Sequence, residues 1–362
     1  MASAYLTRTP SSSGNRKTFT FSFWVKRSGL GFGTFYSQYN SSSNNLNSSF
    51  YFDGQDNLIF WNYNSAYTVN VETNRVFRDT NAWYHIVLSV DTTQSTASNR
   101  VKMYVNGVQE TSFSSSTYPS QNLDLFVNEN KTQQIGIFRY ASDNYYLFDG
   151  YMTHYHFIDG TALTPTSFGE SDSNGVWKPK TSPSVTYGTN GFFLKMDNSG
   201  NMGLDSSGNS NNFTTNGTIT QAKDTPSNVF ATWNSLFRKG TSTPAFSNGS
   251  LTSTFDDAGA NEFALTTLGA SSGKYYAEIK WVSATGTGAT STGILDMGYS
   301  GTADPNNAVT NTFAYFGNGN KNVSGSASSY GSSYTSGDII GIAMDLDNNK
   351  LYFSKNGTWQ NS

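Results

Sequence analysis

Hydrophobic and polar residues alternate along short stretches of this chain, which is the period of a β-strand. In residues 19–25 the alternation puts three phenylalanines and a valine on one face, and the Asn106-Gly107 pair favours a two-residue hairpin turn. No stretch predicts a helix longer than one or two turns. Comparable strands are predicted at 51–53, 58–61, 83–90, 101–105, 150–158, 191–196, 274–281, 293–299, 339–346 and 350–353.

The pattern changes in the middle of the chain. Residues 181–230, which we interpret as a linker, contain one predicted strand. The stretch rich in Asn, Ser and Gly at 198–225 is predicted to be a long ordered loop or linker. We therefore expect a first β-sandwich over 1–180 and a second one over 231–362. Many short strands with regularly spaced turns are typical of sandwiches and jelly rolls, so the predicted fold class is all-β, with two antiparallel jelly-roll domains.

The composition and net charge limit which kinds of ligand and partner the chain is expected to bind. The 362 residues include 22 Lys and Arg against 25 Asp and Glu, a net charge of −3, so no strong field attracts nucleic acid or an anionic membrane. No apolar run approaches the roughly 18 residues of a membrane-spanning helix. There is no cysteine, which excludes disulfides and thiolate metal ligands. Aromatic residues make up 15% of the chain and can fill large cores.

Several segments of the first half carry a family resemblance. The opening at 4–27 and the sequence His-Phe-Ile-Asp-Gly-Thr-Ala-Leu-Thr-Pro at 156–165 resemble laminin-G/concanavalin A-like domains of tailed-phage virion proteins. The match extends over most of residues 4–230, and 156–165 is its most specific part. Further matching segments lie at 83–87, 104–107, 168–170, 175–179, 187–192 and 205–209.

The second half resembles a SPRY module. The similarity lies in Gly-Asp-Ile-Ile-Gly-Ile-Ala-Met-Asp-Leu-Asp at 337–347, followed by Leu-Tyr-Phe-Ser-Lys-Asn-Gly at 351–357. SPRY modules carry further strands after this Asn-Gly turn, so we expect the second sandwich to be incomplete at its C-terminus. Either the natural protein is longer, which we favour, or another chain completes the sheet.

These resemblances imply a non-enzymatic structural protein of a tailed-phage virion. They imply a tail fibre or surface appendage on the virion surface, assembled as a homo-oligomer with other virion proteins, that binds a host-surface glycan or protein. One alternative is a purely structural capsid decoration or fibre segment. Another is a secreted protein that binds or cleaves glycans.

Candidate catalytic groups are few. A glycosidase needs two carboxylates flanking the scissile bond, and no strand here carries Glu-x-Asp-x-Glu or its one-residue-longer form. Glu278 is the single acid of its strand, and Glu170 and Asp172 lie in a Gly-flanked loop without a third acid. A Gly-x-Ser-x-Gly nucleophile elbow is also missing. We predict no catalytic residues and no enzyme activity.

Metal and cofactor sites are not predicted. His154 and His156 lie two residues apart on a predicted strand, so their rings share one face, but two ligands are too few and a surface-facing position is expected. Residues 205–211 carry oxygen-bearing side chains at alternating positions, as Ca²⁺ loops do, but with Asp205 as the single carboxylate. An Asx turn is the favoured interpretation.

Aromatic residues within polar loops are the candidate ligand-binding groups. Sugars stack their C–H faces on rings while amides hydrogen-bond to the hydroxyl groups. The alternative is that these rings fill the edge of the core. The candidate residues are Trp61, Tyr63, Tyr67, Asn144, Tyr145 and Tyr146.

Overall fold

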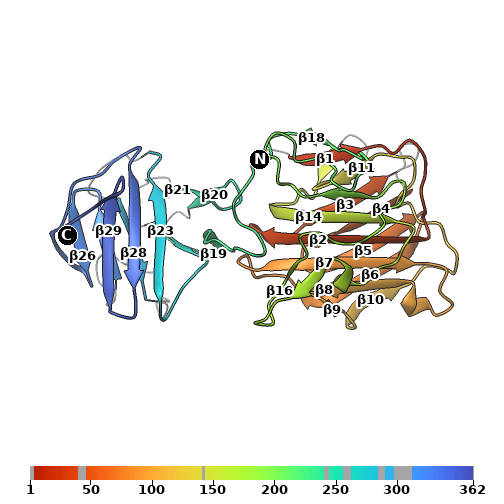
Figure 1. Cartoon of the computed structure of the whole chain (residues 1–362), viewed down its shortest axis with the longest axis horizontal. Coiled ribbons are helices and arrows are strands. Elements are labelled where there is room, and N and C mark those ends of the chain that lie inside the picture. Colours follow the sequence, from red (N-terminus) through yellow and green to blue (C-terminus); the bar gives the residue numbers. More distant parts are fainter. Residues whose placement is uncertain are drawn as a thin grey trace. The chain divides into compact units, whose positions relative to one another are not determined.

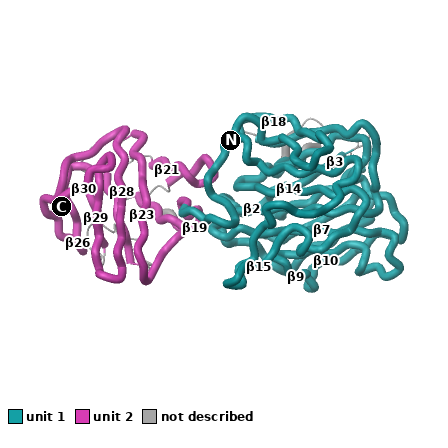
Figure 2. Tube along the Cα trace, in the orientation of Figure 1, with its two compact units in different colours: residues 1–231 teal, residues 232–362 magenta. Residues whose placement is uncertain are grey.

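The structure is a computed structural model that describes residues 4–39, 46–140, 143–239, 244–255, 262–283, 290–296 and 312–361. The chain divides into two compact units, residues 1–231 and residues 232–362 (Figure 2).

Unit 1 is built around two antiparallel sheets, and Figure 1 labels all of their strands except β17. The first sheet has eight strands in the order β10 (Phe113–Thr117), β6 (Tyr67–Val76), β5 (Asn57–Asn64), β4 (Leu46–Phe52), β3 (Gly33–Tyr39), β11 (Gln133–Ile135), β1 (Tyr5–Arg8) and β18 (Thr214–Asn216). The second has six strands in the order β17 (Phe192–Leu194), β14 (Gly150–Asp159), β2 (Thr18–Arg27), β7 (Trp83–Asp91), β8 (Val101–Val105) and β9 (Val108–Gln109).

Short elements complete unit 1. They are the hairpin β12 (Phe138–Tyr140) and β13 (Asp143–Tyr145), the hairpin β15 (Gly169–Ser171) and β16 (Trp177–Pro179), and the 3-10 turns Ala97–Asn99 and Pro165–Ser167.

Aromatic rings fill the space between the two sheets. Phe21 of β2 lies 4.6 Å from Tyr36 of β3, measured between ring centroids, and Phe23 stacks on Tyr155 of β14 at 4.7 Å. All four rings are fully buried. The alternation in 19–25 therefore predicted the inward face of β2 correctly.

The other face of β2 is buried as well, which the alternation did not predict. Thr20, Ser22 and Lys26 are fully buried, although their side chains point away from the core between the sheets. The cause is a second layer formed by the chain after β14. Thr20 Oγ1 donates to the Thr161 carbonyl at 2.8 Å, and Lys26 Nζ contacts Asp224 Oδ2 at 2.7 Å.

Residues 181–230, expected to be a linker, belong to unit 1 instead. Strand β17 pairs with β14 and strand β18 pairs with β1, so this stretch extends both sheets. Met202 and Phe213 are buried, and the Phe213 ring lies 4.7 Å from Phe192. A few buried apolar residues are enough to hold this stretch on unit 1, because polar side chains provide the remaining contacts.

Unit 2 contains two four-stranded antiparallel sheets (Figure 1). One has the order β23 (Lys274–Lys280), β28 (Ile339–Asp345), β29 (Lys350–Lys355) and β30 (Thr358–Trp359); the other has β24 (Ser291–Leu295), β25 (Thr312–Phe316), β26 (Asn320–Val323) and β27 (Ser326–Ser329). Two further hairpins pair β19 (Trp233–Lys239) with β22 (Phe263–Thr266) and β20 (Ala245–Ser247) with β21 (Thr252–Thr254). The core contains Tyr315, Tyr334, Ile340, Ile342 and Phe353.

The predicted fold class is confirmed. Every pairing among the described strands is antiparallel, and the described helical segments are two three-residue 3-10 turns. Within the described parts of the chain, no helix has the length and apolar character needed to cross a membrane.

Candidate functional site

Three of the candidate rings come from the hairpin formed by β5 and β6. Along β5 the side chains alternate, so that Phe60 and Asn62 are buried while Trp61 and Tyr63 lie on the opposite face of the sheet and are only partly covered. The hairpin turn places Tyr67, the first residue of β6, opposite Tyr63. Ser65 in this turn adopts a left-handed backbone conformation with φ of 55°.

The three rings support one another, and we call them the β5–β6 ring cluster (Trp61, Tyr63 and Tyr67). The Tyr67 centroid lies 5.6 Å from Trp61 and 5.1 Å from Tyr63, both with edge-to-face geometry. Trp61 and Tyr63 are 6.2 Å apart. Edge-to-face contacts of this kind hold rings in a defined orientation. Tyr67 is 56% exposed, so part of the cluster faces solvent.

Tyr146 belongs to a neighbouring group of rings. It stacks on Phe32 at 4.0 Å and lies 6.4 Å from Tyr51, with nearly parallel planes in both pairs. Phe138 joins this group to the β5–β6 ring cluster, because its centroid lies 6.0 Å from Tyr146 and 5.9 Å from Trp61. The backbone is held in place where Thr34 of β3 donates to the Tyr146 carbonyl at 3.1 Å.

The other two candidates lie on β13. The backbones of Asn144 and Tyr145 pair with Arg139 and Phe138 of β12, and the side chains of Asn144 and Tyr145 lie outside the described residues. The structure thus brings together four of the six candidates: Trp61, Tyr63, Tyr67 and Tyr146.

Sequence reasoning missed Phe32, Tyr51 and Phe138. The Gly31-Phe32-Gly33 sequence was an available signal, because a ring between glycines in a turn has few neighbours on its own strand with which to pack. Burial raises the pKa of Tyr51, so its hydroxyl keeps its proton. Asn64 and Ser65 add an amide and a hydroxyl group in the exposed turn beside the rings.

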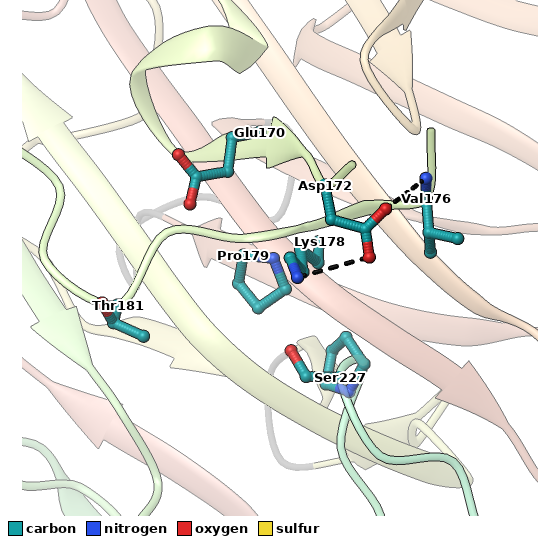
Figure 3. Close-up of a pocket in the computed structure, with 8 residues that line it drawn as sticks. Glu170, Asp172, Val176, Lys178, Pro179, Thr181 and Ser227 are labelled. Atoms are coloured by element: carbon teal, nitrogen blue, oxygen red, sulfur yellow. Dashed lines mark hydrogen bonds and ion pairs between the residues drawn. The ribbon is translucent and has the colours of Figure 1, made fainter. Parts of the chain in front are cut away.

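A separate cavity of about 370 Å³ lies beside the hairpin of β15 and β16 (Figure 3). Asp172 accepts backbone hydrogen bonds from Val176 at 3.0 Å and Asn174 at 2.9 Å, and it forms an ion pair with Lys178 at 3.3 Å. The hydrogen bond from Val176, with the others, lowers the pKa of Asp172. A general acid requires the opposite shift. The cavity is lined by Glu170, Asp172, Val176, Lys178, Pro179, Thr181, Pro226 and Ser227.

The expected surface position of the histidines on β14 is wrong for His156. This ring is buried and stacks on Phe193 at 3.9 Å, and its Nδ1 is 2.9 Å from the Tyr187 hydroxyl oxygen. His154 also contacts Phe193, at 6.0 Å. His156 is buried because the segment that includes β17 covers this part of β14. Among the described residues, no three His, Cys, Asp or Glu side chains are grouped to hold a metal ion.

Asp205 forms the predicted Asx turn. Its Oδ1 accepts hydrogen bonds from the backbone nitrogens of Phe193 and Ser207, each at 2.8 Å. Its Oδ2 accepts hydrogen bonds from the Ser207 hydroxyl and the Asn211 backbone nitrogen, also at 2.8 Å. The carboxylate therefore bonds to its own loop and to β17, as the turn interpretation requires.

Two family models match the chain. Residues 2–168 match the concanavalin A-like lectin/glucanases superfamily, in its laminin G form, and residues 274–361 match the SPRY domain. The domain architecture is therefore a laminin-G/concanavalin A-like domain followed by a SPRY domain. A search of curated proteins finds no match.

Three solved structures are among those similar to this chain. A SAP-like pentraxin from Limulus polyphemus is 16% identical with a TM-score of 0.34, over 44% of this chain and 71% of that chain. A putative carbohydrate-binding protein from Bacteroides ovatus is 15% identical with a TM-score of 0.38, over 62% of this chain and 58% of that one. Domains LG4-5 of the mouse laminin α1 chain are 8% identical with a TM-score of 0.34, over 99% of this chain and 74% of that chain.

Proposed function

We propose that unit 1 binds carbohydrate through the β5–β6 ring cluster together with Tyr146. The observation that carries this proposal is that Trp61, Tyr63 and Tyr67 pack on one another at the surface of the sheet, with Tyr67 more than half exposed. Phe138 connects Tyr146 to this cluster. Rings fixed in this way offer apolar faces to the C–H groups of a pyranose, and the amide and hydroxyl of Asn64 and Ser65 can bond to its hydroxyl groups.

Binding without catalysis is part of the proposal. The match of residues 2–168 to a lectin and glucanase superfamily is compatible with glycan binding and with glycan hydrolysis. Whether unit 1 can hydrolyse a glycan therefore depends on its individual carboxylates. Asp172 is held ionised by the backbone of its own turn and by Lys178, which is unsuitable for a proton donor. Measuring release of reducing sugar from polysaccharides tests this part, and any release dependent on Glu170 or Asp172 would contradict it.

The binding proposal is tested by removing single rings. We expect Tyr67→Ala and Trp61→Ala each to weaken glycan binding roughly two- to twelve-fold, because one stacking contact contributes about 0.5–1.5 kcal/mol. The matched control is Tyr275→Ala in unit 2, a tyrosine with a similar exposed fraction, 51% against 56%. A glycan array identifies the ligand, and titration of that ligand measures the affinity of each variant.

Melting temperatures of the same variants separate binding from stability. Tyr67→Ala should leave the melting temperature of unit 1 nearly unchanged, because the ring is half exposed. If the array finds no ligand, or if affinity is unchanged in both variants, the rings do not form the binding surface.

We propose further that the protein lies on the surface of a tailed-phage virion, as a homo-oligomer in a tail fibre or appendage with other virion proteins, and that its ligand is a host-surface glycan. The support for this setting is the resemblance of residues 4–27 and 156–165 to such virion proteins. Antibodies against this chain should label the outside of purified particles in electron micrographs. If particles are labelled by the antibody but adsorb to the host equally well when the rings are replaced by alanine, the purely structural role is favoured.

A further inference from the structure

The sheet of β23, β28, β29 and β30 in unit 2 carries a second group of exposed rings. Register places Tyr276, Ala343 and Tyr352 side by side across three strands. The next row contains Glu278, Gly341, Ser354 and Trp359. Because alternate residues of a strand share a face, both rows lie on the same side of the sheet.

The rings of this face do not belong to the core of unit 2. The core uses the opposite side chains of the same strands, among them Ile342 and Phe353. Tyr276, Tyr352 and Trp359 are 55%, 49% and 47% exposed. Trp359 lies 6.3 Å from Tyr276 and 6.5 Å from Tyr352, with edge-to-face geometry in both pairs. We call these three residues the unit 2 ring face.

Local contacts hold the ring face in one arrangement. The Tyr276 hydroxyl donates a hydrogen bond to Glu278 Oε1 at 2.7 Å. Gly341 lies beneath it, and a Cβ atom there would be 2.6 Å from that hydroxyl oxygen. Because glycine has no side chain, Tyr276 can lie close to the sheet. A preorganised surface loses less conformational entropy when a ligand binds.

The charges on this face are nearly balanced. Strand alternation puts Lys274, Lys280 and Lys350 on it together with Glu278 and Asp345, and Lys274 forms an ion pair with Asp345 at 3.0 Å. Three positive and two negative groups give no strong field for a polyanion or a polycation. An uncharged ligand that combines apolar faces with hydroxyl groups fits the exposed rings and the balanced charge of this face.

We propose that the unit 2 ring face is a second carbohydrate-binding surface, for an uncharged pyranose unit of a polysaccharide. The sugar stacks on Trp359 and Tyr352, while the Glu278 carboxylate accepts a hydrogen bond from a sugar hydroxyl group. This surface is independent of the β5–β6 ring cluster of unit 1, so either proposal can fail without the other.

The test is affinity electrophoresis of the full chain in native gels containing xylan, galactomannan, barley β-glucan or dextran. Trp61→Ala/Tyr67→Ala serves as the background, because it removes stacking rings of unit 1. In this background we expect retardation by at least one polysaccharide. Adding Trp359→Ala or Tyr352→Ala should weaken the affinity roughly two- to twelve-fold per ring.

Two controls keep the result specific. Tyr275→Ala removes an exposed ring from the opposite face of β23 and should leave retardation unchanged. Trp359→Phe retains a ring and should restore most of the affinity lost in Trp359→Ala. Circular dichroism melts confirm that each variant is folded.

Three outcomes would overturn the proposal. One is that none of the four polysaccharides retards the background variant. Another is that retardation is equal with and without Trp359 and Tyr352. The third is concentration-dependent self-association that Trp359→Ala abolishes, which would make a second copy of this chain the occupant of the ring face.

Discussion

At the scale of single residues, the three histidines of the chain make unit 1 sensitive to acid. Burial lowers the pKa of His85 to about 3 and lowers those of His154 and His156. His85 is enclosed by polar and aromatic partners, since its Nε2 lies 2.9 Å from Ser22 Oγ and its Nδ1 accepts a hydrogen bond from Trp177 at 2.9 Å.

The sign of the effect follows from proton binding. Well above pH 6.5 these histidines are neutral in both the folded and the unfolded states, so they cause no pH dependence there. Below pH 6.5 the unfolded state takes up protons that the folded state does not, and the free energy of unfolding falls. The expected slope is at most about 1.4 kcal/mol per pH unit for each histidine. Urea unfolding of unit 1 between pH 7.5 and pH 5 measures it, and a constant midpoint across this range would contradict the prediction.

At the scale of the elements, the segment 198–225 shows what the sequence pattern missed. Its few apolar residues predicted a long loop or linker between the two sandwiches. Its anchors are instead polar groups that bond to distant strands, such as Asp205 to β17 and Asp224 to Lys26 of β2. Trp83 also donates to Asp224, at 2.9 Å. A hydrophobic pattern does not register such contacts, because they join residues that are remote in the sequence.

We therefore predict that 198–225 resists limited proteolysis in the intact protein. Asp224→Ala should make the segment the first site of cleavage, because it leaves the buried Lys26 ammonium unpaired, at a cost of about 3–5 kcal/mol. Asp172→Ala is the matched control, since it removes the partner of Lys178, a lysine whose side chain is 37% exposed while that of Lys26 is fully buried. Mass spectrometry of the first fragments identifies the sites, and early cleavage within 198–225 of the unmodified protein would contradict the structure.

The sequence predicted only part of the candidate site, just as it predicted only part of the burial of the strands. The mixture of rings and amides at 61–67 identified Trp61, Tyr63 and Tyr67, although the structure places them on β5 and β6 and not in a loop. Phe32 and Phe138 come from segments before β3 and at β12, and they join the rings only through tertiary packing. The same limit explains β2, where the pattern predicted the inward rings but not the burial of Ser22 and Lys26 under a covering layer.

At the scale of the whole molecule, the hydrophobic residues form two separate cores. The larger one contains rings from both sheets of unit 1, including Phe21, and the smaller one includes Tyr315 and Phe353 of unit 2. Because, among the residues that the structure describes, neither core includes residues of the other unit, calorimetry of the full chain should resolve two unfolding transitions. Phe353→Ala should lower one transition and Phe21→Ala the other, each at a cost of about 3–5 kcal/mol for a buried ring. If either substitution shifts both transitions equally, the two units unfold as one cooperative structure despite their separate cores.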